Sequence, residues 1–245
     1  MSVRQSKTLL ADLLIIATLF LSAITVKPVL SATFIVNSTE NAVDAVPGDG
    51  TCETETENGI CTLRAAIQET NALPGADTIT FSIAPENPLN FRIIEVPYAL
   101  PLIKDQLTIQ GPNLGGTGAS ITLDGDGTFI GLWVDANNCV IRNLTIRNFE
   151  RGIAATNASG LLIVGNRIGK FGVSIPNPLE GNAKEGIYFD NVIGAVIGGD
   201  TAADRNIISG NGQSGILLLD SASVVIKGNY IGTNENGTAA ALPQY

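Results

Sequence analysis

From residue 76 onward, the chain consists of short apolar runs separated by Gly, Asn and Asp. Within a run, apolar residues tend to occupy alternate positions, which is the period of a β-strand that buries one face. No stretch in this part keeps apolar residues at helical spacing over about ten residues, as a buried helix would. The pattern therefore predicts an all-β architecture, with its first strands at 78–81, 92–96, 107–111 and 121–125.

From residue 131 the chain repeats itself. Four units each open with a glycine followed by an apolar residue, at Gly131, Gly152, Gly186 and Gly215. Successive units are 21, 34 and 29 residues apart, and the extra residues lie in polar inserts such as N-P-L-E-G-N-A-K-E and G-D-T-A-A-D. Constant apolar spacing with variable polar insertions is typical of a solenoid, in which each repeat packs against its neighbours.

Equivalent isoleucines recur in these units. In a parallel β-helix, like positions of successive coils stack at about 4.8 Å, so each set of isoleucines predicts one internal ladder. The first ladder contains Ile141, Ile163 and Ile226, with Ile197 at the same interval. The second ladder contains Ile146, Ile168, Ile208 and Ile231, and Ile208 is delayed by the second insert.

Three asparagines, Asn166, Asn206 and Asn229, each stand two residues before an isoleucine of the second ladder. We expect their amides to stack at one turn, where they can satisfy backbone groups and each other. Leu144 occupies this position in the first unit, so the amide stack should end there. Cys139 aligns with inward-facing apolar residues and is expected to be a buried small hydrophobe and not a reactive thiol.

One helix is predicted, over residues 63–73, with Thr62 as its N-cap. An open β-helix exposes unpaired strand edges, so we expect this helix to cap the N-terminal end of the coils. The cap region is assigned to 33–75 and the parallel β-helix to 76–245. The sequence stops where another Gly-Ile strand is due, so we expect the β-helix to be incomplete and to continue in further coils or to dock on a partner.

The start of the chain has the pattern of an export signal peptide. A basic segment precedes a mainly apolar run of fourteen residues at 13–26, and Val29 and Ser31 suit the small-residue positions before a cleavage site. We therefore predict that residues 1–32 form the leader and that the mature chain starts near Ala32 or Thr33. The alternative is a retained membrane anchor, for which the apolar run is short.

The amino-acid composition excludes several kinds of functional site. The formal net charge of −9 argues against nucleic acid as a partner, because a phosphate backbone requires a basic surface. The chain contains no histidine, which excludes Ser-His-Asp and Cys-His catalysis and histidine-ligated zinc or haem. Cys52 and Cys61 close a short acidic loop and are expected to form a disulfide in an oxidising compartment. The acids of this loop could bind calcium but lack EF-hand spacing, so we expect no metal and no cofactor.

Two stretches resemble known families. G-D-G-T-C at 48–52 and C-T-L-R-A-A-I-Q-E-T-N-A-L-P-G-A-D-T-I at 61–79 resemble the CSLREA domain, although Thr62 and Ala66 depart from its name-giving hexad. That resemblance implies the N-terminal part of an exported bacterial surface protein. The motifs G-N-R-I-G, I-I-S-G-N and G-N-Y-I-G-T-N resemble right-handed parallel β-helix proteins of the pectate-lyase-like superfamily. The resemblance implies the fold but no single function, since that fold carries lyases, hydrolases, adhesins and inert stalks.

The candidate catalytic residues are three aspartates near strand ends, Asp135, Asp190 and Asp220. On adjacent coils, Asp190 and Asp220 could lie about one strand spacing apart, near the roughly 5–5.5 Å used by retaining glycosidases, so a polysaccharide hydrolase is geometrically possible. Thr156 occupies the same place in the unit between those of Asp135 and Asp190, however, and Asp, Asn and Ser at strand ends commonly form turns through their own backbone. Turn formation is therefore the favoured interpretation over catalysis.

We expect an extracellular or surface-displayed bacterial β-helix with a structural, adhesive or glycan-contacting role, and with no catalysis in this segment. Its expected partner is a polysaccharide or cell-surface glycan, and it would meet the membrane only during export. The alternative function is a polysaccharide lyase or glycoside hydrolase that uses the strand-end aspartates, with or without calcium.

Overall fold

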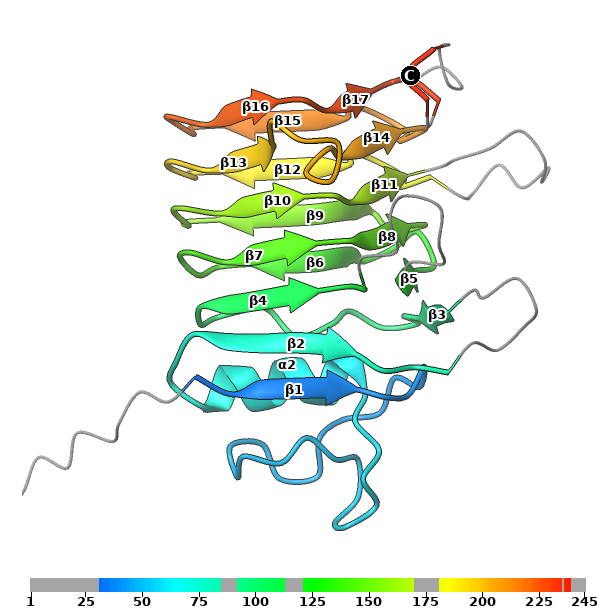
Figure 1. Cartoon of the computed structure of the whole chain (residues 1–245), viewed down its shortest axis with the longest axis vertical. Helices are drawn as coiled ribbons and strands as arrows, with labels where there is room; N and C mark the ends of the chain where they lie inside the picture. The colour runs from blue at the N-terminus through cyan, green and yellow to red at the C-terminus, as the bar shows by residue number, and fades with distance from the viewer. Residues whose placement is uncertain (1–30, 85–91, 113–120, 170–180, 235, 239–245) are drawn as a thin grey trace, which may run out of the picture.

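A computed structural model describes residues 31–84, 92–112, 121–169, 181–234 and 236–238. Nearly all of the predicted leader, residues 1–32, lies outside this part of the chain, so the leader stays a prediction. Within the described part, no helix is long and apolar enough to cross a membrane. The strands stack as rungs along the longest axis of the molecule, and the N-terminal region closes one end of the stack (Figure 1).

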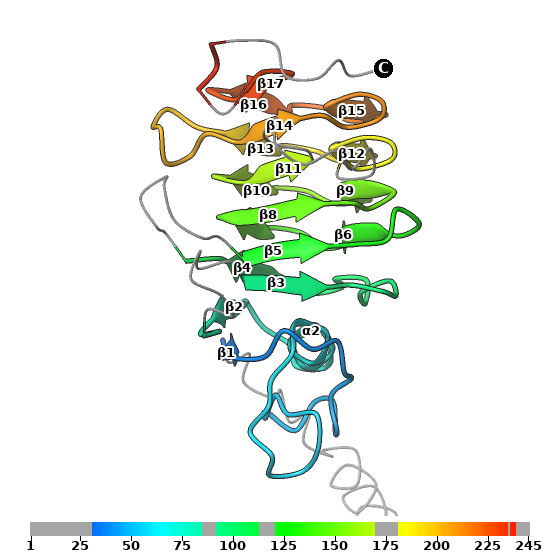
Figure 2. The ribbon, with the colours of Figure 1, turned by 90° about the vertical axis from the view of Figure 1, so that its right-hand side faces the viewer.

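The rungs form three sheets in which the neighbouring strands run parallel. Sheet A contains β1 (Thr33–Val36), β2 (Asp77–Phe81), β4 (Leu107–Gln110), β7 (Val140–Arg142), β10 (Leu162–Val164), β13 (Val196–Gly198) and β16 (Val225–Lys227). Sheet B contains β3 (Arg92–Glu95), β5 (Ile121–Asp124), β8 (Leu144–Arg147), β11 (Arg167–Gly169), β14 (Ile207–Ser209) and β17 (Tyr230–Ile231). Sheet C contains β6 (Ile130–Val134), β9 (Arg151–Thr156), β12 (Ile187–Asp190) and β15 (Ile216–Leu219). Figure 2 shows the same stack from the side of sheet B.

Both isoleucine ladders run through the interior in the register expected from their spacing. Ile163 pairs with Ile141 on one side and with Ile197 on the other, and Ile168 pairs with Ile146 and Ile208. These side chains are buried, whereas the last member of each ladder is not: Ile226, which pairs with Ile197, is 43% exposed, and Ile231, which pairs with Ile208, is 42% exposed. Ile226 and Ile231 thus have the expected register but not the expected burial, because β16 and β17 are the last described strands of sheets A and B and no described rung covers them.

The turn between sheets A and B holds a ladder of amides. Asn166 accepts from the backbone of Leu144 at 3.1 Å, and its own Nδ2 donates to Oδ1 of Asn206 at 3.1 Å. The Nδ2 of Asn206 in turn donates to Oδ1 of Asn229 at 2.9 Å and to the carbonyl of Ile163 at 2.7 Å. At this turn the backbone has left sheet A and has not yet entered sheet B. The buried side-chain amides there supply hydrogen bonds that water would otherwise make.

A second buried amide pair lies at the turn before sheet C. Asn182 donates from Nδ2 to Oδ1 of Asn211 at 2.8 Å, and its Oδ1 accepts from the backbone of Phe149 at 3.1 Å. This pair was not predicted. Asn182 belongs to a polar insert that hides its alignment with the other coils.

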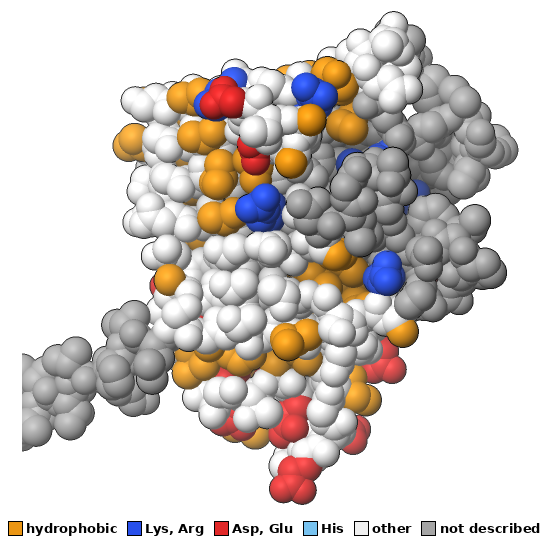
Figure 3. Space-filling model, viewed as in Figure 1, with side chains coloured by type: hydrophobic (Ala, Val, Ile, Leu, Met, Phe, Trp, Pro, Cys, Tyr) orange, Lys and Arg blue, Asp and Glu red, His pale blue; other side chains and the backbone are white. Residues whose placement is uncertain are grey.

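The N-terminal end is covered by α2 (Leu63–Ala72), which packs against β1 and β2. Thr62 is its N-cap, and the Thr62 hydroxyl oxygen accepts from the backbone of Ala65 at 3.0 Å. Cys52 and Cys61 form a disulfide just before the helix. Acidic side chains gather around this end in the space-filling view (Figure 3). Strand β1 was not predicted, because its partner β2 follows more than forty residues later in the chain.

Candidate functional site

The outer face of sheet C carries a row of side chains that we call the aromatic row. Strand alternation buries Ile153 and Ala155 in the core and turns Ala154 outward. Ala154 is in register with Trp133 on one side and with Tyr188 on the other, and Leu217 follows next to Tyr188. The aromatic row therefore consists of Trp133, Ala154, Tyr188 and Leu217 on four successive rungs.

Two rings of this row enclose its smallest member. Ala154 is only 1% exposed although it faces outward, because its neighbours Trp133 and Tyr188 flank it on adjacent rungs. Trp133 is 42% exposed, and its Nε1 donates to the hydroxyl oxygen of Thr156 at 3.2 Å. That bond holds the polar edge of the indole and leaves apolar ring surface to solvent.

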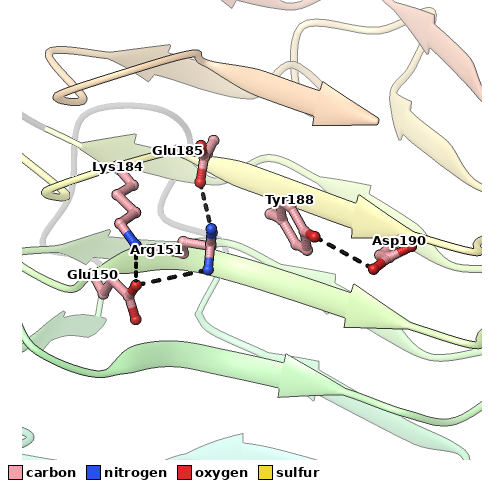
Figure 4. A network of polar contacts seen from close by, with 6 residues as sticks. All are labelled: Glu150, Arg151, Lys184, Glu185, Tyr188 and Asp190. Carbon is pink, nitrogen blue, oxygen red and sulfur yellow. Dashed lines mark hydrogen bonds and ion pairs between the residues drawn. The ribbon is translucent and has the colours of Figure 1, made fainter. Parts of the chain in front are cut away.

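A network of charged groups borders the row at the start of the strands (Figure 4). Arg151 donates from Nε to Glu185 at 2.6 Å and lies 3.7 Å from Glu150, which also accepts from Lys184 at 2.5 Å. Glu185 is 2% exposed, so its partner Arg151 offsets the cost of burying its charge. Each cation of this network faces a carboxylate, and the network adds no net charge to the site.

The network reaches the aromatic row through Tyr188. The guanidinium of Arg151 lies over the Tyr188 ring at 4.3 Å from its centroid, a cation–π arrangement. The Tyr188 hydroxyl donates to Oδ2 of Asp190 at 3.4 Å. Desolvation and the nearby Asp190 carboxylate raise the pKa of Tyr188, so its hydroxyl stays protonated and acts as a donor.

The register corrects the expected pairing of aspartates. Asp190 lies between Thr156 and Leu219, so Asp220 is not its partner on the next rung. Asp220 is one residue further along, in a turn with a φ of 43°, where the preceding unit has Asn191 at a φ of 56°. Asp220 therefore occupies a turn position, which agrees with the favoured interpretation, and it does not pair directly with Asp190 across the adjacent strands.

Asp135 does share a row with Asp190. It follows β6 at the place that Thr156 occupies in β9, so the order across the rungs is Asp135, Thr156, Asp190. Asp135 also lines a polar depression of about 320 Å³ beside the end of β6. The other lining residues are Lys104, Asp105, Gln106, Ala136, Asn137, Asn138 and Asn157.

The free thiol and the possible metal ligands of the chain do not contribute to the outer face of sheet C. Cys139 is buried in the core, and desolvation raises the pKa of its thiol to about 11, so it stays protonated at neutral pH. Among the described residues, no group of three Cys, Asp or Glu side chains comes together in a way that could hold a metal ion.

The aromatic row was missed at the level of sequence, although a signal for it exists. Each of its four members stands two residues after a unit glycine. Counting from the unit glycine also distinguishes Asp220 from the other two aspartates. Asp135 and Asp190 stand four residues after their glycines, whereas Asp220 stands five after its own. In a coil with constant strand register, a difference of one residue turns a side chain to another direction.

Residues 120–242, half of the chain, match a family model described as a right handed beta helix region. No curated protein matches the chain. The match includes all of sheet C and its aromatic row, and it supplies the hand of the coil. The predicted fold class is thereby confirmed as an all-β, right-handed parallel β-helix with an N-terminal helix.

Proposed function

Because the chain belongs to the right-handed β-helix family, we propose that it is an exported or surface-displayed protein that contacts glycans along the outer face of sheet C. The family is compatible with structural roles and with pectate-lyase-like roles, so the choice between them depends on the site. The aromatic row is the observation that carries the proposal.

The chemistry of the row suits a sugar chain. A sugar ring has faces of C–H groups and edges of hydroxyls, and an exposed aromatic ring with polar groups beside it complements both. Trp133 supplies exposed ring surface, while Thr156, Asp190 and the charged network supply donors and acceptors at its edges. The row crosses the rungs, so a bound polysaccharide would lie along the axis of the coil.

Export is supported by the start of the chain. The predicted leader at 1–32, the resemblance of 48–79 to the CSLREA domain, and the disulfide between Cys52 and Cys61 agree with a bacterial protein that folds in an oxidising compartment. We therefore propose that it acts outside the cytoplasm.

Binding to a panel of soluble polysaccharides, measured by affinity electrophoresis and calorimetry, tests the proposal. Trp133→Ala and Tyr188→Ala should each weaken binding about tenfold, since loss of a central aromatic contact costs on the order of 1–2 kcal/mol. Tyr98→Ala is the matched control, because Tyr98 is 69% exposed and lies outside sheet C. Equal weakening by all three variants, or no binding across the panel, would contradict the proposal.

A second candidate function follows from Asp135 and Asp190. Two rungs separate their positions by about 9–10 Å, which is near the upper end of the roughly 6.5–9.5 Å between the carboxylates of inverting glycosidases. A hydrolase would release reducing ends with inverted anomeric configuration, and Asp135→Asn and Asp190→Asn would each abolish release.

A lyase with Tyr188 as its base is disfavoured, because a base needs a lowered pKa and the pKa of Tyr188 is raised. Binding without product in this assay would leave the glycan-contacting role.

A further inference from the structure

A buried carboxylate stands beside the predicted cleavage site of the leader. Asp77, at the start of β2, is 1% exposed, and its Oδ1 accepts from the backbone nitrogen of Ala32 at 2.8 Å. Its other oxygen, Oδ2, is also buried and has no hydrogen-bond partner among the described residues. A buried carboxylate oxygen without a partner is costly, so this site lacks a donor.

The surroundings of Asp77 favour a cation at that place. Desolvation raises the pKa of Asp77, and the neighbouring Asp105 carboxylate raises it further. Asp105 itself accepts from the backbone of Gly75 at 3.1 Å and of Gln106 at 2.7 Å. No Lys or Arg forms an ion pair with Asp77 or Asp105 in the described part of the chain.

We propose that hydrolysis of the Ser31–Ala32 bond leaves an α-ammonium group on Ala32 that forms a buried ion pair with Asp77. Water adds across the peptide bond, the carboxylate stays on Ser31 and departs with the leader, and the freed amine takes up a proton. The amide of Ala32 has one hydrogen, which it donates to Oδ1. The ammonium has three and can also serve Oδ2.

The backbone holds Ala32 where this pairing requires it. Thr78 donates to the carbonyl of Ala32 at 2.9 Å, and the parallel ladder of β1 and β2 begins at the next residue, with Thr33 opposite Thr78. Ala32 also packs against the apolar core. Its nitrogen would therefore stay beside Asp77 after the leader is gone, and the ion pair would tie the first strand to the capped end.

The first experiment locates the cut. The full chain is exported from a bacterial host, and the mature product is analysed by intact mass and N-terminal sequencing. A start at Ala32 is the expected result. A start at any other residue, or retention of the leader, would overturn the proposal.

The second experiment measures the ion pair. The chain that starts at Ala32 is compared with a chain that starts at Val29, in which the nitrogen of Ala32 remains an amide, and each is made with Asp77 and with Asp77→Asn. The free terminus should raise the folding equilibrium constant roughly tenfold when Asp77 is present. It should have little effect in the Asp77→Asn background, because no carboxylate is left there for the ammonium to pair with. Asp126→Asn is the matched control, because Asp126 is exposed and bonds only Thr128.

A third measurement covers the case in which Asp77→Asn does not fold. The pKa of the Ala32 amine, followed by NMR in the folded mature chain, should lie above the usual range of about 7.7–8.0. Stabilisation by the ammonium would be present below that usual range and would be lost as the pH rises through the raised pKa. An amine pKa at or below the usual range, or equal effects of the free terminus in both backgrounds, would refute the ion pair.

Discussion

At the scale of single residues, asparagine has a structural role that an apolar residue cannot take over. Asn206 lies in the middle of the amide ladder and is fully buried. It accepts from Asn166 and donates to Asn229 and to the carbonyl of Ile163. Each amide thus serves its neighbours and the backbone of the turn, and the ladder spans three rungs.

Replacement of Asn206 by alanine should therefore be costly. Asn206→Ala removes the acceptor of the buried Asn166 backbone N–H and the amide that donates to the Ile163 carbonyl. Each buried group left unpaired costs roughly 1–3 kcal/mol. Asn229→Ala should cost less, because Asn229 lies on the last described rung and is partly exposed to solvent. Urea denaturation of both variants measures the difference, and equal losses would contradict it.

Three buried acids of the N-terminal end predict a pH dependence. Desolvation raises the pKa values of Asp44, Glu69 and Asp77 above their unfolded values. Protonation therefore stabilises the folded state, fully so below the unfolded pKa values of about 4, and this gain is lost as the pH rises through the raised values. In a chain that retains residues before Ala32, the unfolding free energy should rise when the pH is lowered from about 7 to about 5.

Glu69→Gln tests the contribution of one of these acids. Glu69 accepts from the backbones of Gly48 and Gly50, both at 2.5 Å. The glutamine amide would place an N–H group against one of these donors, so the variant should be less stable by roughly 1–3 kcal/mol and less dependent on pH. A pH profile as steep as that of the parent would show that Glu69 does not contribute.

At the scale of the element, the unit glycines explain why the rungs can stack. A Cβ on Gly152 would lie 2.7 Å from the carbonyl oxygen of Gly186 and 2.8 Å from Cγ2 of Ile168. Gly131 and Gly186 meet the same obstacle in the carbonyl of the next unit glycine. The glycine repeat therefore marks the place where successive coils approach most closely at the entrance to sheet C.

Gly152→Ala should consequently force the rungs apart. We expect a loss of about 2–3 kcal/mol in unfolding free energy, the range of an overpacked core. Gly194→Ala separates this effect from backbone conformation, because Gly194 has a φ of +69° and nothing within 4 Å of its Cβ position. That variant should lose only about 1 kcal/mol, and a larger loss there than at Gly152 would contradict the packing explanation.

At the scale of the whole molecule, stability should depend on position along the stack. Ile163 and Ile226 occupy the same ladder, but Ile163 is fully buried between rungs whereas Ile226 is 43% exposed. Ile163→Ala should cost about 2–5 kcal/mol, and Ile226→Ala less than half as much. Thermal or urea unfolding of the two variants checks the gradient, which equal losses would exclude.

The whole molecule also shows which features of this fold can be predicted from the sequence. The ladders and the parallel register were predictable, because each coil repeats its apolar spacing and stacks on its neighbour. Strand β1 was not, since Thr33 pairs with Thr78 across the whole cap. The spacing left open a pairing of Asp190 with Asp220, and the register rules it out by one residue. The aromatic row was missed because outward positions carry no common residue type from rung to rung.

The insert between β13 and β14 has a practical consequence. Residues 199–204 lengthen one turn, yet Ile208 still pairs with Ile168 as though the extra residues were absent. Thr201, Ala202 and Ala203 are exposed at its tip. A foreign peptide grafted there would be displayed at a defined position along the stack of rungs, without disturbing their register. This turn is therefore suited to carrying an epitope.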